Sequence, residues 1–154
     1  ILMPGILEWP GRIKKPFVTD IPAVTSDYFP TALAAANIPL PDDRDYDGIN
    51  LLPLIDGKMK KRKGIGFHCR GMQAWVEHRY KVIRLTSKKR EPNPWELYDL
   101  LADPFEEKDL AKELPEVVRR MEEEFTVWAT SVQADEQKVL DKYHSTKTKK
   151  KKSK

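Results

Sequence analysis

Three carboxylates at alternate positions form the pattern in this chain that looks most like a metal site. Asp43, Asp45 and Asp47 precede a glycine, with the spacing of a calcium loop of the EF-hand kind, whose alternate oxygen ligands surround the ion. Such a loop needs a bidentate carboxylate at its twelfth position, but Leu54 occupies that position here. The pattern therefore predicts a solvated acidic turn rather than a calcium site.

Other side chains with catalytic or metal-binding chemistry are scattered. His68, His78 and His144 fit no metal-ligand spacing, and the single cysteine, Cys69, permits no internal disulfide and cannot anchor zinc alone. A lone cysteine in an apolar strand is more often a small buried hydrophobe than a nucleophile. No glycine-rich phosphate loop or Gly-x-Ser-x-Gly elbow occurs. The sequence thus assembles no nucleophile, base and oxyanion donors.

The net charge of +4 comes from the C-terminal end of the chain. The last eight residues hold no acid and six lysines: Lys147, Lys149, Lys150, Lys151, Lys152 and Lys154. A run of this kind can bind polyanions or serve in nuclear import, although a solvated, disordered end is commoner. No aromatic residue is interleaved to stack on bases, and we expect no basic face on the folded part. Binding of a polyanion by this tail stays open as the alternative.

The elements that must position these residues begin with one strand and one helix. Residues 5–9 predict a short strand covered on both faces, although no similar strand follows nearby. A helix is predicted to start at Thr25 and Ser26, whose hydroxyls would cap it, and to end at Asn37. Residues 41–64 are rich in Pro, Asp, Gly and Lys, and they predict a surface connection with one apolar turn.

The rest of the chain predicts an antiparallel sheet covered by a long helix. Four strands are expected, at residues 65–69, 73–76, 80–85 and 95–99, with residues 77–79 as a hairpin connection. The helix is expected to begin at Pro115. The apolar stripe that would cover the sheet consists of Val117, Val118, Met121, Phe125, Trp128 and Val132. The lysine tail is expected to fray.

One patterned unit, residues 95–111, begins with the last predicted strand. It reads Trp-Glu-Leu-Tyr-Asp-Leu-Leu-Ala-Asp-Pro-Phe-Glu-Glu-Lys-Asp-Leu-Ala. This run resembles the closing segment of the sulfatases, which carry a Glu-Leu-Tyr-Asp-Leu, Asp-Pro, Glu and Asn/Asp-Leu pattern near the C-terminus of a longer enzyme. Four other segments, residues 4–11, 24–33, 47–57 and 79–83, resemble patterns of the same family in the same order.

The resemblance implies an α+β fold in which a small antiparallel sheet of about four strands packs on a long C-terminal helix. A strand and a helix from an incomplete alkaline-phosphatase-like α/β domain would precede it. The expected divisions are a catalytic-domain remnant (1–40), a connecting loop (41–64), a C-terminal sulfatase subdomain (65–134), and a helix extension with a disordered lysine-rich tail (135–154).

Sulfatases hydrolyse sulfuric esters with bound calcium and a formylglycine made from the Cys or Ser of a Cys/Ser-x-Pro-x-Arg motif. The resemblance places both upstream of the matched part, because Cys69 is followed by Arg-Gly-Met-Gln. No catalytic residue or metal ligand is therefore carried over. We expect a C-terminal sulfatase fragment that has no turnover alone; the alternative is a noncatalytic interaction module with a polyanion-binding tail.

In similar enzymes the strand that contains His68 can edge the substrate cleft. His68 and Arg70 are therefore the candidate contacts to a sulfate-ester substrate, with ordinary surface or sheet roles as the alternative. A chain that begins at Ile1 is expected to be a fragment, and it shows no secretory signal pattern. Sulfatases are typically lysosomal, secreted or periplasmic, but these residues specify neither compartment nor substrate.

Overall fold

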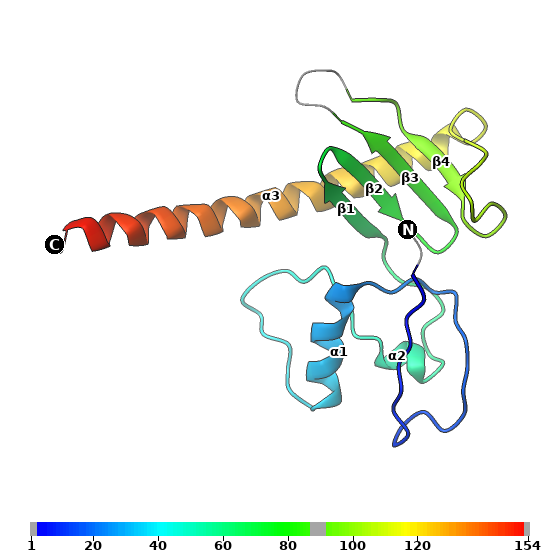
Figure 1. Ribbon diagram of the computed structural model, residues 1–154, viewed down its shortest axis with the longest axis horizontal. Coiled ribbons are helices and arrows are strands. Elements are labelled where there is room, and N and C mark those ends of the chain that lie inside the picture. Colours follow the sequence, from blue (N-terminus) through cyan, green and yellow to red (C-terminus); the bar gives the residue numbers. More distant parts are fainter. Residues whose placement is uncertain (1–2, 87–91, 153–154) are drawn as a thin grey trace. The chain divides into compact units, whose positions relative to one another are not determined.

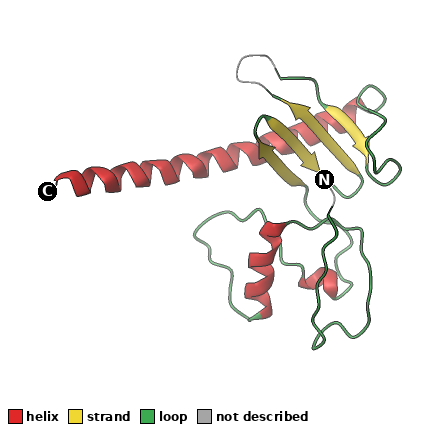
Figure 2. Cartoon of the chain, in the orientation of Figure 1, coloured by secondary structure: helices red, strands yellow, loops and turns green. Residues whose placement is uncertain are grey.

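The computed structural model describes the backbone of residues 3–86 and 92–152, and their side chains through Tyr143 except Lys142. The chain divides into two compact units, residues 1–65 and 66–154. Helices and loops make up most of the first unit, whereas the second contains the sheet and the long helix (Figures 1 and 2). Each unit is described by itself.

The first unit contains short helices joined by long loops. The 3₁₀ turn Thr25–Asp27 leads directly into α1 (Tyr28–Ala35), and α2 covers Leu52–Ile55. The strand predicted at residues 5–9 is wrong, because no strand lies within the described residues 3–64. An extended segment becomes a strand only when a neighbour accepts its backbone hydrogen bonds, and this segment has no such neighbour in the described part.

The predicted helix at residues 25–37 is confirmed, but its start is held differently. Neither Thr25 nor Ser26 caps the helix; instead Asp27 Oδ2 accepts a hydrogen bond from the Val24 amide at 2.8 Å. Asn37 ends the helix in the left-handed region, at φ 56°, which asparagine tolerates better than most residues. The sequence therefore predicted both ends of this helical segment correctly, but it assigned the cap to the wrong side chains.

A buried carboxylate holds the first unit together. Asp27 is fully buried, and its Oδ1 accepts the Ile49 amide at 2.8 Å. Arg62 donates to both oxygens of the same carboxylate, at 2.6 and 3.1 Å, with its own side chain only 1% exposed. Gly48 lies so close to this turn that a Cβ there would fall 2.0 Å from the Ser26 carbonyl oxygen. Segments separated by more than 20 residues are therefore joined by one side chain.

The second unit is built on one four-stranded sheet, as the sequence predicted. Its strands, in the order in which they pair, are β1 (Ile65–Cys69), β2 (Met72–Val76), β3 (Tyr80–Leu85) and β4 (Glu96–Asp99). The pairs β2–β3 and β3–β4 are antiparallel, with Val82 opposite both Trp75 and Leu97. The predicted hairpin at residues 77–79 is confirmed, because the Glu77 amide donates to the Tyr80 carbonyl at 2.8 Å.

The turn from β1 to β2 was not predicted. Arg70 and Gly71 both have positive φ angles, 48° and 83°, as a two-residue primed hairpin turn requires. The second position suits glycine, because a Cβ on Gly71 would lie 2.5 Å from the Thr86 carbonyl oxygen. Arginine is an unusual first residue for such a turn, so the Asn-Gly and Asp-Gly signatures did not reveal it.

Helix α3 (Pro115–Lys152) crosses one face of the sheet and continues beyond it, as Figure 1 shows. The core between sheet and helix consists of Trp75, Val82, Trp95, Leu97, Met121 and Phe125. Gly66 permits a close approach on this face, because a Cβ there would lie 2.2 Å from the Trp128 ring. Val132, predicted in the covering stripe, is 38% exposed, because the apolar contacts with the sheet end near Ala129.

The C-terminal end of α3 also differs from the expectation of a disordered tail. Its backbone remains helical through Lys152. Lysine is a good helix former, and pairs one turn apart support the exposed helix, such as Lys138 with Asp135 at 2.7 Å. The lysine side chains of the tail, and Lys154 altogether, lie outside the described part. Among the described helices, none combines the length and apolar character needed to cross a membrane.

Candidate functional site

The two predicted substrate contacts lie at one end of the β1–β2 hairpin. His68 belongs to β1 and Arg70 to the turn that follows it, and both side chains are exposed. Neither forms a hydrogen bond or ion pair with the described part of the chain. Cys69, between them, is exposed rather than buried as expected, because it lies on an edge strand. A substrate contact by His68 and Arg70 stays a prediction.

The carboxylates of the patterned unit at residues 95–111 lie in β4, which ends at Asp99, and in the loop that follows it. Asp99 Oδ1 accepts the amides of Leu101 and Ala102, both at 3.2 Å, which fixes the first turn of the loop. Asp99 Oδ2 accepts a hydrogen bond from Arg79 Nε at 2.9 Å, across the β3–β4 pair. Because one carboxylate binds both the turn after β4 and the hairpin between β2 and β3, Asp99 acts as a structural residue.

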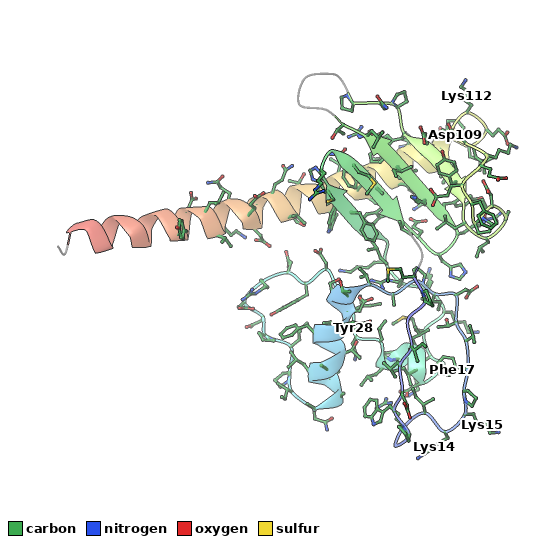
Figure 3. All side chains as sticks on the ribbon, viewed as in Figure 1. Lys14, Lys15, Phe17, Tyr28, Asp109 and Lys112 are labelled. Atoms are coloured by element: carbon green, nitrogen blue, oxygen red, sulfur yellow. The ribbon has the colours of Figure 1, made fainter. Side chains whose placement is uncertain are left out.

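The later acids of the same unit fold the loop back onto the strand. Asp103 Oδ2 accepts the Lys108 amide at 2.9 Å. Asp109, labelled in Figure 3, accepts the amide of Leu97 in β4 at 3.0 Å through Oδ1. Glu106 receives the largely buried ammonium of Lys81 at 2.7 Å. The sequence indicated a turn here, but it gave no sign that each of these acids accepts a specific donor.

The environment of Asp99 gives a test of this structural role. The hydrogen bond from Arg79 lowers the pKa of Asp99, so the folded chain holds this carboxyl ionised below the value of about 3.9 expected when unfolded. This stabilisation is therefore present at neutral pH and is lost as pH falls through the folded pKa. We expect Arg79→Met to raise the pKa of Asp99, measured by NMR titration of its carboxyl carbon.

Arg119→Met is the matched control, because Arg119 pairs with Glu116 and Glu123 on the exposed face of α3. It should leave the titration midpoint of Asp99 unchanged. An Asp99 midpoint that does not move in Arg79→Met would contradict the assigned pairing.

The residues present do not fit a calcium ion. In the acidic stretch, Asp43 accepts hydrogen bonds from Arg44 Nη2 at 2.6 Å and from the Tyr46 hydroxyl at 2.9 Å. The hydrogen bond from Arg44 lowers the pKa of Asp43 to about 2, so this carboxylate is already paired. Across residues 3–86 and 92–143, no three His, Cys, Asp or Glu side chains cluster in a way that could hold a metal.

The sequence from residue 1 to residue 131 matches the family model described as N-sulphoglucosamine sulphohydrolase, C-terminal. The chain belongs to the sulfatase family. It corresponds to the C-terminal part of family members, and its antiparallel sheet with a C-terminal helix is the fold of that part. In the sulfatases the calcium and formylglycine belong to the N-terminal domain, which the matched part does not include.

Relatives of this sulfatase chain are much longer than the chain itself. An uncharacterized sulfatase of Schizosaccharomyces pombe is 30% identical over 139 residues, which cover 83% of this chain and 25% of that protein. Human steryl-sulfatase is 44% identical over 61 residues, 40% of this chain and 10% of the enzyme. The chain thus spans between a tenth and a quarter of the length of these two relatives.

Solved structures agree with the fold of this sulfatase chain. A structure from Bacteroides thetaiotaomicron, described in a study of glycosaminoglycan metabolism, is 29% identical, with a TM-score of 0.55, and the match covers 68% of this chain and 24% of that one. A second structure from the same study reaches a TM-score of 0.62 at 21% identity, covering 81% and 30%. The second likeness concerns the fold alone.

Proposed function

We propose that this chain is the supporting C-terminal part of an enzyme that hydrolyses sulfuric esters, and that it has no turnover alone. The observation that carries the proposal is the family match over residues 1–131. The hydrogen bonds of the closing loop support it, because Asp99, Asp103 and Asp109 are engaged in holding backbone amides. Such carboxylates are poorly placed to coordinate a metal or transfer a proton.

Within this proposal, residues 1–40 belong structurally with the catalytic domain, and the sheet and helix form a subdomain beside it. Stabilising a sulfuryl-transfer transition state needs a metal ion or a cluster of cations at one point. The nucleophile and that cluster would come from sequence outside these 154 residues. His68 and Arg70 would contribute contacts to the edge of the substrate site.

A sulfated sugar is the substrate class we propose for the whole enzyme. The family model is named for an N-sulphoglucosamine sulphohydrolase, and the neighbour at 29% identity comes from a study of glycosaminoglycan metabolism. The steryl-sulfatase match extends over 40% of the chain, so it carries less weight for the choice of substrate.

The test is an assay of the purified 154-residue chain with calcium and an aryl sulfate. We expect no hydrolysis above the buffer rate, and Cys69→Ala should behave as the parent chain does. Turnover that disappears in Cys69→Ala would contradict the proposal, because the exposed cysteine would then be a nucleophile. Binding of a polyanion by residues 147–154 remains the alternative role, and a comparison of heparin binding by the whole chain and by the chain without these residues tests it.

A further inference from the structure

Two lysine-rich loops of the first unit meet at one ion pair. They are residues 12–15 and residues 58–61, named here the basic loops, and their lysines are Lys14, Lys15, Lys58, Lys60 and Lys61. The guanidinium of Arg12 binds both carboxylate oxygens of Asp56, at 3.0 and 2.7 Å. This bidentate contact holds the first loop beside the start of the second.

The positive charge of the basic loops exceeds the negative charge beside it. Asp56 is the carboxylate at their junction; the hydrogen bond from Arg12 lowers its pKa, and the charge of Lys58 acts in the same direction. All five lysines are exposed, and none forms an ion pair within the described residues. Figure 3 shows Lys14 and Lys15 on the outer side of their loop, where Lys14 Nζ also donates to the Pro10 carbonyl at 3.2 Å.

The chemistry of these cations favours one kind of polyanion. The nearby guanidiniums are engaged, Arg12 with Asp56 and the buried Arg62 with Asp27, which leaves flexible ammonium groups. Ammonium groups attract anionic groups, but they lack the planar, bidentate geometry with which arginine recognises phosphates and bases. Phe17 is an exposed aromatic residue next to these loops, but a single ring does not form a stacking platform for successive bases.

We infer that the basic loops bind a sulfated polysaccharide. Lysines spread over two adjoining loops match a linear polymer with repeated anionic groups, and binding releases the counterions condensed on it. Holding the polymer would raise its concentration near the enzyme. The choice of a sulfated polysaccharide rests on the proposed function, whereas the evidence for a polyanion-binding surface comes from the lysines of the basic loops.

The test uses a fluorescent heparin oligosaccharide and the chain without residues 147–154, so that the tail makes no contribution. Replacing Lys58, Lys60 and Lys61 by glutamine should weaken binding by about tenfold or more, and the slope of log K against log salt should become shallower by roughly one per lysine lost. Lys14→Gln with Lys15→Gln should act in the same direction. N-desulfated heparin should bind the parent chain more weakly.

The matched control replaces three exposed lysines of the second unit, Lys108, Lys112 and Lys138, by glutamine. It removes the same total charge and should leave affinity nearly unchanged. Circular dichroism of each variant checks that the chain remains folded. Equal losses in the control and loop variants would overturn the inference, as would the absence of heparin binding by the chain without residues 147–154.

Two further probes test whether the basic loops prefer a sulfated polysaccharide to other anionic partners. Single-stranded DNA and phosphatidylserine vesicles should bind more weakly than heparin at the same salt concentration; tighter binding of either one, with the same lysine dependence, would overturn the polysaccharide assignment. A different measurement tests the proposed function. If the enzyme that includes the upstream domain does not hydrolyse aryl sulfate, the proposed function fails. Heparin binding by the basic loops would survive that result.

Discussion

Replacing Asp27 by alanine should destabilise the first unit by about 3–5 kcal/mol, since removing one partner of a buried ion pair leaves the other charge uncompensated. Arg62 would lose both carboxylate contacts while remaining 1% exposed. The amides of Val24 and Ile49 would also lose their acceptor. Hydrogen exchange of the Ala36 amide, which donates to the Ala32 carbonyl in α1, reports the loss without involving the mutated side chain.

Two comparisons isolate the cause. Asp43→Ala breaks an exposed pair with Arg44 in the same unit, and it should change stability by no more than about 1 kcal/mol. The double change Asp27→Ala with Arg62→Met should recover part of the loss, because the buried charge is then absent. If the double variant is less stable than Asp27→Ala alone, the uncompensated guanidinium is not the source of the effect.

Phe125→Ala should lower the free energy of unfolding of the second unit by about 3–5 kcal/mol, the range for truncating a buried aromatic residue. Phe125 is 2% exposed, and its ring meets Trp95 edge-on at 5.3 Å and Trp128 at 5.6 Å. The resulting cavity would lie between α3 and the sheet. Urea unfolding followed by tryptophan fluorescence measures the loss, since both neighbouring indoles report on the same contact.

Val127→Ala is the control for this prediction, because Val127 lies two residues away on α3 with 74% of its side chain exposed. Its effect should stay within about 0.5 kcal/mol. Equal losses from Phe125→Ala and Val127→Ala would contradict the prediction, because alanine favours the helix at both positions and only Phe125 packs against the sheet.

The second unit was predictable because its periodicities are local. The apolar residues of β2 and β3 and the helical spacing of Met121 and Phe125 are visible in the sequence, and Trp75, Val82, Met121 and Phe125 form the core. The first unit gave a weaker signal. Its main contact joins Asp27 to Arg62, 35 residues later, and no periodic pattern marks a polar pair of that separation.

The candidate site was predicted less completely, for physical reasons. The sequence placed His68 and Arg70 at the end of a strand, and the structure agrees on that position. It did not reveal that Cys69 is exposed, because the residue pattern does not show which strand lies at the edge of the sheet. The junction of the basic loops depends on the contact between Arg12 and Asp56, which local sequence patterns do not indicate.

The acids at the end of β4 and in the loop after it give the family pattern a particular meaning. Asp99, Asp103 and Asp109 each accept backbone amides that close the chain onto the sheet. A pattern made of such residues indicates that a chain has this fold, and it does not indicate that the chain is catalytically active. A homologue that has lost its nucleophile should therefore still carry it, and the presence of an active enzyme has to be judged from residues elsewhere.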